Sequence, residues 1–300
     1  MKFVCYKEFN DPEEPVYPGI LYDGKTLPLA RVVAVAEAIH PQGLTVPDDL
    51  DALLAMLGLF PPMVKELERA KVLDKIWQEI GVTPAAPVPR PRRILAIGRN
   101  YAGHAHEQGQ DVPDEPVVFL KASTSVIGPE MPIVIPPGVG RVDHEGELAV
   151  VIGRAARRVT EREALSYVAG YTLINDVTAR DQKNRDAARG LPWTLSKGYD
   201  TFCPMGPCLV TADEIRNPQT LEITVTVNGE VRQHAKTSDM LFSVAKLIAY
   251  LSDKVALEPG DVIATGTPSG ISPLKPGDTV EVTIPQIGTL TNPVVAEEDL

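Results

Sequence analysis

The chain has 300 residues, 44% of them hydrophobic and 23% charged, which is typical of a soluble globular protein and excludes a disordered or fibrous one. Its formal net charge of -11 argues against nucleic acid and anionic membranes as partners, because both require a basic surface. No apolar run approaches the roughly 20 residues of a membrane span, and no apolar leader follows Met1. We therefore expect a cytoplasmic protein with small-molecule ligands. Cys5, Cys203 and Cys208 are too few and too scattered for a disulfide framework and should be reduced.

The first 83 residues are predicted to form a small domain of strands and helices. A strand is expected at 2–9 and a hairpin at 19–29, with its turn at Asp23-Gly24. Asp48 or Asp49 can cap a helix that the prolines after Phe60 end, and a second helix is expected from 63 to about 76.

Four prolines between residues 84 and 91 favour an extended segment. We place a linker at 84–92 and a second domain at 93–300. Short β-prone runs dominate that second domain, with Asn228-Gly229 as a hairpin turn, so the predicted fold class is α+β and mainly β. Few helices are expected there, among them 160–168, from the capping-box spacing of Thr160 and Glu163, and 240–251, capped by Ser238 or Asp239. The expected strands are 94–97, 119–120, 133–135, 148–152, 171–178, 221–227, 262–264 and 280–284.

Acidic residues lie at the ends of two of these strands. Alternation along the strand before Gly153 places Glu145 and Glu147 on one face and His144 on the other, and Asp176 ends a second run. Like charges so close must be hydrated, protonated or neutralised by a cation. Three oxygen donors suit Mg²⁺, Mn²⁺ or Ca²⁺ better than zinc. The pattern alone leaves two interpretations equally open, a metal site and an exposed strand end whose acids maintain solubility.

Two further clusters bear on function. His104 and Glu107 stand at i and i+3, so one helical turn would let the carboxylate orient the imidazole, although the pattern by itself favours a loop with surface histidines. Arg180 and Lys197 follow the third acid, and such cations bind substrate carboxylates. The Gly-Thr-Pro-Ser-Gly stretch at 266–270 lacks the ending of a phosphate loop and is either a substrate loop or a plain turn.

Six blocks in chain order resemble the fumarylacetoacetate hydrolase family: GRNYAGHAHE at 98–107, KASTS at 121–125, HEGE at 144–147, NDVTARD at 175–181, LPWTLSK at 191–197 and GTPSG at 266–270. The resemblance covers the chain from about Arg93 to the end, and six ordered blocks are far more specific than any one. It implies a mixed β-roll catalytic domain and a homodimer, as in bacterial acylpyruvate hydrolases and 2-hydroxyhepta-2,4-diene-1,7-dioate isomerases. It also implies Mg²⁺ or Mn²⁺, with Ca²⁺ as a substitute, on Glu145, Glu147 and Asp176.

The resemblance further implies a catalytic dyad of His104 and Glu107 on a mobile lid, with Lys197 as a third catalytic residue. Substrate would be bound by Arg180, Lys121, Gly266 and Thr267. The implied activity is attack on a 2-oxoacid through a metal-bound enolate, most directly C–C hydrolysis of an acylpyruvate or fumarylpyruvate. Isomerisation of a hydroxymuconate-type diacid and decarboxylation of oxaloacetate are the alternatives. A catalytically silent metal-binding scaffold is a remote one, because it has no need of both the dyad and Lys197.

Overall fold

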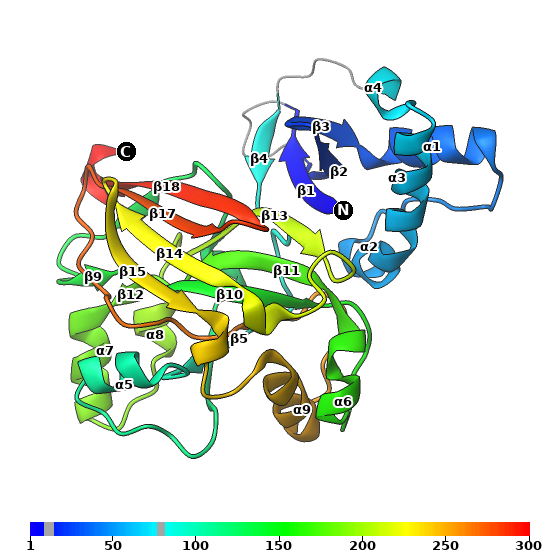
Figure 1. The fold of residues 1–300 in the computed structure, drawn as a ribbon. Coiled ribbons are helices and arrows are strands. Elements are labelled where there is room, and N and C mark those ends of the chain that lie inside the picture. Colours follow the sequence, from blue (N-terminus) through cyan, green and yellow to red (C-terminus); the bar gives the residue numbers. More distant parts are fainter. Residues whose placement is uncertain (9–14, 77–81) are drawn as a thin grey trace.

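The computed structural model describes residues 1–8, 15–76 and 82–300, and Figure 1 shows two packed β-sheets with helices around them. Phe9, the expected end of the first strand, lies outside the described residues. The mainly β composition and the mixture of strands and helices confirm the predicted fold class. Within the described residues, no helix is long and apolar enough to cross a lipid bilayer.

The larger sheet joins strands from distant parts of the chain, in the order β3-β2-β1-β13-β11-β10-β16-β5-β6, with β4 beside β1 and β7 beside β13. The pairs β5–β16 and β7–β13 are parallel. The strands are β1 (Lys2–Lys7), β2 (Tyr17–Tyr22), β3 (Lys25–Pro28), β4 (Thr83–Ala85), β5 (Ile94–Gly98), β6 (Val117–Lys121), β7 (Val126–Ile127), β10 (Gly146–Ile152), β11 (Val168–Asn175), β13 (Cys203–Thr211) and β16 (Val262–Ala264).

A second sheet covers one face of the first and has the order β15-β14-β17-β18-β8. The predicted Asn228-Gly229 turn is present, with φ of 53° and 79°, which is the left-handed conformation that a two-residue hairpin turn requires. A short pair, β9 (Val142–Asp143) with β12 (Thr178–Ala179), lies beside the functional residues. The strands of the second sheet are β8 (Ile133–Ile135), β14 (Glu222–Val227), β15 (Glu230–Lys236), β17 (Thr279–Ile284) and β18 (Gly288–Ala296).

Strand β10 shows how the sequence divides the core. Leu148 and Val150 belong to the apolar cluster between the two sheets, whereas Ala149 and Val151 belong to the cluster on the opposite face. This is the period-2 alternation of a strand that is buried on both sides. At its start, a Cβ on Gly146 would collide with Val225 of the second sheet, so the glycine lets the sheets approach here.

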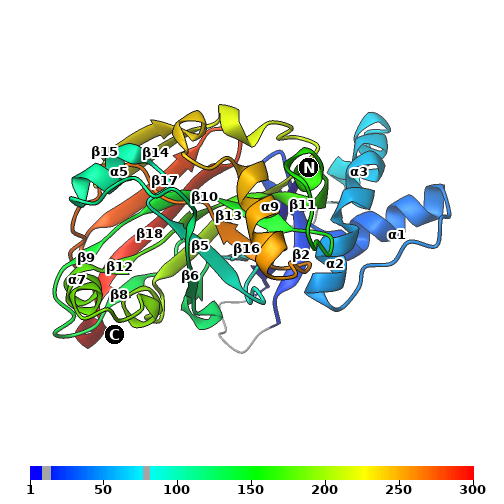
Figure 2. The same cartoon turned by 90° about the horizontal axis from the view of Figure 1, so that it is seen from below.

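The helices lie at the edges of the sheets, with α1, α2 and α3 on the N-terminal side and α5, α7 and α8 together on another (Figure 1). Helices α6 and α9 cover a third region, seen from below in Figure 2. Their bounds are α1 (Leu29–Ile39), α2 (Leu50–Met56), α3 (Phe60–Arg69), α4 (Leu73–Ile76), α5 (Ala102–Glu107), α6 (Glu161–Ala164), α7 (Arg180–Ala188), α8 (Thr194–Lys197) and α9 (Val244–Lys254).

Several helix boundaries differ from expectation for identifiable reasons. Asp49 caps α2 as predicted, accepting a hydrogen bond of 2.9 Å from the backbone of Ala52. The prolines after Phe60 start α3 instead of ending a helix, because the fixed φ of proline fits a first turn. The expected single helix over 63–76 was wrong: α3 ends at Arg69, and Lys71 has a φ of 56° before α4 begins.

The two helices expected in the second part differ from their predicted bounds: α6 is shorter than 160–168, and α9 begins and ends later than 240–251. The capping box of Thr160 and Glu163 is present, but α6 gives way to a 3₁₀ turn after Ala164. Helix α9 is capped by Ser243, whose side chain accepts from the backbone of Lys246, and not by Ser238 or Asp239. Local capping chemistry was therefore identified at one site and misassigned at the other.

The proline-rich stretch is extended as predicted, and it is packed. Pro84 pairs with Tyr6 in the β4–β1 ladder, and Ala86 and Val88 are buried. One apolar cluster also joins side chains of the first 88 residues, such as Phe3, to the strands β10, β11 and β13. The division into domains at 84–92 stays a prediction.

Candidate functional site

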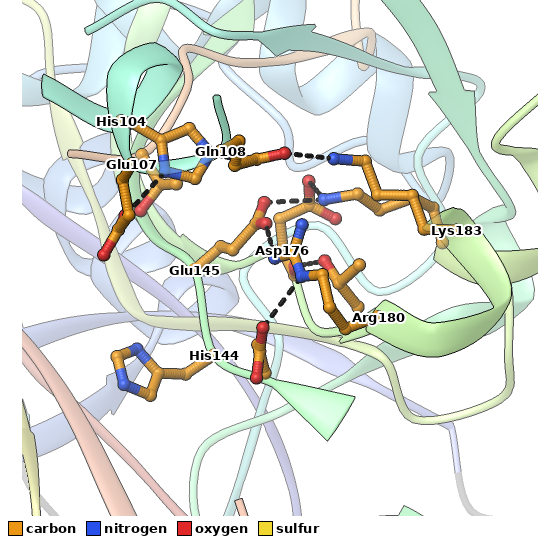
Figure 3. Close-up of polar contacts among 12 residues, drawn as sticks. His104, Glu107, Gln108, His144, Glu145, Asp176, Arg180 and Lys183 are labelled. Atoms are coloured by element: carbon orange, nitrogen blue, oxygen red, sulfur yellow. Dashed lines mark hydrogen bonds and ion pairs between the residues drawn. The ribbon is translucent and has the colours of Figure 1, made fainter. Parts of the chain in front are cut away.

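The register between β10 and β11 brings the three predicted acids together. Gly146 lies opposite Asn175, and the Asp176 backbone N–H donates to the Glu145 carbonyl at 2.7 Å. Oxygen atoms of Glu145, Glu147 and Asp176 all lie within 4.8 Å of one another, and all three residues are buried. His144 points away from these acids, and its Nδ1 lies 3.1 Å from Gln233 (Figure 3). The predicted placement of His144 on the opposite face from Glu145 and Glu147 is therefore confirmed.

Buried cations surround two of the acids. Lys197 Nζ lies 2.6 Å from Glu145 and 2.5 Å from Asp176, and Arg180 pairs with both Glu145 and Asp143. Burial raises the pKa of Glu145, but Lys197 and Arg180 outweigh it and hold that pKa well below its usual range. Burial lowers the pKa of Lys197, and the two acids reverse this and raise it. Both partners of this pair are therefore ionised.

Glu147 is in a different position. The backbone N–H of Gly266 donates to its carboxylate at 2.8 Å, and no Lys or Arg of the described residues pairs with it. Burial, together with Asp176 and Glu145, raises the pKa of Glu147 well above its usual range. A buried acid facing two other acids gains most from a shared cation.

The donor set fits a divalent ion. Lys121 Nζ lies 2.8 Å from Asp176 Oδ1, yet that buried oxygen accepts no well-directed hydrogen bond, which leaves it a free lone pair. Lys121 instead donates to the Lys197 carbonyl at 2.5 Å. Three carboxylates provide about half of the octahedral oxygen shell that Mg²⁺ or Mn²⁺ prefers.

Helix α5 places a histidine beside this cluster. His104 Nδ1 is 3.4 Å from Glu107, and its Nε2 is 2.5 Å from the amide nitrogen of Gln108 (Figure 3). Burial lowers the pKa of His104 more than Glu145 and Glu107 raise it, so the imidazole is neutral at pH 7. The expectation of a helical turn at i and i+3 is confirmed, and the alternative of a surface loop is wrong, since His104 is 3% exposed.

Gly266 and Thr267, which were predicted to bind substrate, lie in the loop after β16 and form hydrogen bonds to β10. Thr267 donates to the Gly146 carbonyl at 2.9 Å, and Gly266 contacts Glu147 as described above. Gly266 has a φ of 97°, and a Cβ there would lie 2.7 Å from the Cβ of Asn100. This loop therefore holds β10 and one acid in place through its backbone.

Sequence reasoning missed several residues of the site. Asp143 pairs with Arg180 at 2.8 Å, and Lys183 donates to Gln108 at 2.8 Å. Lys183 follows Arg180 by three positions, a helical spacing that could have indicated a shared face. Gln108 offered no such signal. The three acids, His104 and Lys197 line a small cavity of about 10 Å³, room for about one water, together with Ile97, Gly98, Arg99, Gln108, Phe119, Lys183, Trp193 and Thr267.

The chain is similar to proteins of related chemistry. The mitochondrial oxaloacetate tautomerase of Rattus norvegicus is 44% identical over 221 residues, 71% of this chain and 70% of that protein. The structure of 5-carboxymethyl-2-hydroxymuconate delta-isomerase from Mycobacterium smegmatis matches 99% of both chains at 36% identity, with a TM-score of 0.73. That of maleylpyruvate hydrolase from a Sphingobium species, in complex with manganese(II) and pyruvate, matches 99% of both chains at 30% identity, with a TM-score of 0.76.

Residues 93–295 match the family model described as fumarylacetoacetate (FAA) hydrolase C-terminal. This span contains all six blocks, and with them the three acids, His104 and Lys197. The chain therefore belongs to the fumarylacetoacetate hydrolase family.

Proposed function

We propose that this protein is a divalent-metal-dependent enzyme that hydrolyses the C–C bond of a short acylpyruvate or fumarylpyruvate-like substrate. One observation supports this more than any other: a buried, neutral His104 held by Glu107 stands beside a buried acidic triad. Hydrolysis needs both a base for water and a group that accepts developing negative charge.

The residues that would hold Mg²⁺ or Mn²⁺ are Glu145, Glu147 and Asp176. When bound, the ion supplies a Lewis acid that stabilises negative charge developing on the 2-oxo group of the substrate. Nε2 is the unprotonated nitrogen of His104 when Nδ1–H donates to Glu107, and in this structure it accepts from the side-chain amide of Gln108. His104 would take a proton through Nε2 from the water that attacks the distal carbonyl, once that water replaces the Gln108 amide.

The buried cations would serve the anionic substrate. Lys197 stays charged, because its pKa is raised, and it would offset charge on a substrate oxygen. Arg180 offers a planar set of donors for a carboxylate, and its buried Nη1 has no hydrogen-bond partner in the described chain. The cavity is too small for a substrate of seven carbons, so neighbouring side chains must separate when one binds.

Tautomerisation or isomerisation of a 2-oxo diacid is the second candidate. It is favoured by the similarity to an oxaloacetate tautomerase and to a hydroxymuconate isomerase. Both reactions move a proton between carbon and oxygen, which a neutral histidine beside a cationic site can also do. Decarboxylation of oxaloacetate would use the same charge stabilisation.

A substrate panel separates these reactions. Acetylpyruvate, fumarylpyruvate, oxaloacetate and a hydroxymuconate-type dienoate are each incubated with the enzyme and Mg²⁺ or Mn²⁺, and in parallel with EDTA. Hydrolysis releases pyruvate and a free acid, decarboxylation releases pyruvate and CO₂, and isomerisation changes the ultraviolet absorbance without a fragment. We expect metal-dependent pyruvate release from the first two substrates. An absorbance change with no fragment from any of them contradicts the hydrolase assignment.

A further inference from the structure

We propose that Arg99 and Lys183 bind the carboxylate of a dicarboxylate substrate that is farther from the 2-oxo group, and so set a preference for diacids over monoacids. This rests on the proposed function, since it names further substrate-binding residues of the same site. Arg99, Lys183 and Lys197 line the cavity, and Lys121 and Arg180 contact its acids from outside that lining. Lys121, Lys197 and Arg180 already pair with the acids, whereas Arg99 and Lys183 have no carboxylate partner within the described residues.

Lys183 is a buried amine whose contacts are neutral. It lies one helical turn after Arg180 on α7, its Nζ donates to Gln108 at 2.8 Å, and it stands 4.6 Å from the ring centre of Trp193. Burial lowers its pKa to about 7, and nearby Lys197 and Arg180 contribute in the same direction against Glu145. An incoming carboxylate is the group that such an ammonium lacks.

Arg99 is held toward the same cavity by an unusual backbone. Its φ is 57°, a left-handed conformation that a non-glycine residue keeps only when its surroundings impose it. The surroundings are the buried Asn100 side chain, which donates to the carbonyls of Phe242 and Thr265 and accepts from the Phe242 backbone. Arg99 Nε is buried without a hydrogen-bond partner in the described structure. A strained residue with an unsatisfied donor at a cavity wall indicates a ligand contact.

Two aromatic side chains also line this cavity. Phe119 and Trp193 meet edge to face with centroids 5.3 Å apart. A Cβ on Gly98 would lie 2.8 Å from the Trp193 ring, so the glycine is what admits the indole. The cavity therefore combines acids for a metal, aromatic side chains that can contact a carbon chain, and two cations with no carboxylate partner among the described residues. A short 2-oxo diacid matches all three features, whereas a monoacid leaves both cations without a counter-charge.

The kinetic test uses two substrates that differ only in the distal group, 2,4-dioxoheptanedioate and 2,4-dioxoheptanoate. The wild type should prefer the diacid in kcat/KM. Arg99→Met and Lys183→Met should each lower the diacid-to-monoacid ratio by about 10- to 100-fold, the range expected for one charge-assisted hydrogen bond. Arg99→Lys and Lys183→Arg, which keep the charge, should recover part of it. Arg185→Met is the matched control, because Arg185 is an exposed cation on the same helix.

A binding test separates this proposal from the hydrolase assignment. Calorimetry with Mn²⁺ compares 2-oxoheptanedioate with 2-oxoheptanoate, which lack the 4-oxo group and cannot be cleaved as acylpyruvates. If the wild type cleaves neither dioxo acid but the Arg99 and Lys183 variants lose affinity for the diacid, the hydrolase assignment fails and the subsite stands. If the wild type cleaves both without preference, or the ratio changes as much in Arg185→Met, the subsite is wrong. Circular dichroism checks that each variant is folded.

Discussion

Glu147 differs from its two neighbours because no Lys or Arg in the described part of the chain forms an ion pair with it, and this difference makes it the better probe of the metal site. Replacing Asp176 leaves Lys121 and Lys197 short of a counter-charge, which threatens the fold as well as the metal. Replacing Glu147 with its neutral isostere removes only a carboxylate whose pKa is already raised. A change at Glu147 therefore tests metal binding alone, whereas a change at Asp176 also disturbs the buried ion pairs.

The first prediction concerns this ligand. Glu147→Gln should keep the far-ultraviolet circular dichroism of the wild type and weaken Mn²⁺ binding by about 100-fold or more, with loss of turnover. Asp176→Asn should also abolish turnover. Calorimetric titration with MnCl₂ measures the affinity, and Asp114→Asn, at an exposed position, is the control. Unchanged Mn²⁺ affinity in Glu147→Gln, or full turnover in excess EDTA, contradicts the assignment.

The second prediction concerns the dyad. Because Glu107 contacts His104 and also accepts from the Gly270 backbone at 3.0 Å, it should orient the imidazole without touching the metal. His104→Ala and Glu107→Gln should each lower kcat by about 10²- to 10⁴-fold with Mn²⁺ affinity retained. A double variant no slower than the slower single variant indicates one shared role. Two singles with wild-type kcat show that the pair has no catalytic role.

The third prediction concerns pH. A base must be neutral, and the pKa of His104 is lowered from its usual 6.5. For the monoacid 2,4-dioxoheptanoate, whose binding needs no charge on Lys183, kcat/KM should therefore be constant near pH 7 and fall on acidification below pH 6.5. Glu107 raises that pKa, so Glu107→Gln should move the acid limb to still lower pH while lowering the plateau. A metal ion bound to the three acids would also lower the pKa of His104. The exposed His234→Gln should leave the profile in place, and an acid limb above pH 7 contradicts the role of His104.

At the scale of elements, the site depends on how closely two sheets approach at the start of β10. Gly146 is part of the same strand as Glu147, and a Cβ there would collide with Val225 and come within 3.1 Å of Val282. Both valines belong to the core between the sheets. Any side chain at this position must separate β10 from the second sheet.

The fourth prediction follows from that contact. Gly146→Ala should lower the free energy of unfolding by about 1–3 kcal/mol through overpacking, and it should weaken Mn²⁺ binding because Glu147 moves with the strand. Urea denaturation measures the first effect and calorimetry the second. Gly58→Ala is the control, since Gly58 is exposed and a Cβ there meets nothing within 4 Å. Equal stability of the two variants contradicts close packing at Gly146.

At the scale of the whole molecule, the first part of the chain supplies β1, β2 and β3 of the large sheet and helices that share one apolar cluster with its central strands. Phe3, Ile20 and Phe60 are at most 1% exposed and share an apolar cluster with Met205 and Leu209 of β13. Burial of each such side chain stabilises the fold by about 1.5–3 kcal/mol. Without the first part of the chain, the apolar residues that β10, β11 and β13 contribute to this sheet face would be exposed to water.

The fifth prediction tests the domain division. A fragment of residues 93–300 should bind a hydrophobic dye, self-associate and melt below the full chain, because that sheet face is uncovered. Light scattering and thermal unfolding measure these properties, and light scattering of the full chain also tests the expected homodimer. A fragment that is monodisperse and as stable as the full chain supports two independent domains and contradicts the shared core.

The sequence by itself determined the local features of this protein. Alternation assigned Glu147 and His144 to opposite faces of one strand, the spacing of His104 and Glu107 indicated one helical turn, and two dipeptides fixed hairpin turns. These features depend on neighbours within a few residues, where strand and helix periodicity apply. The order of six motifs supplied the family, and with it the expected ligands.

Only the tertiary structure decided which groups meet across the chain. Lys183 reaches Gln108, 75 positions away, and Arg180 reaches Asp143, 37 positions away, and neither contact has a local signature. Helix α1, which has no side-chain cap, also went unpredicted, because burial against the N-terminal core and not its own sequence holds it. Contacts between distant segments depend on strand order and sheet packing, which local patterns do not encode. The charge balance of the site could therefore be seen only in the folded chain, where two acids pair with cations and Glu147 pairs with none of the described ones.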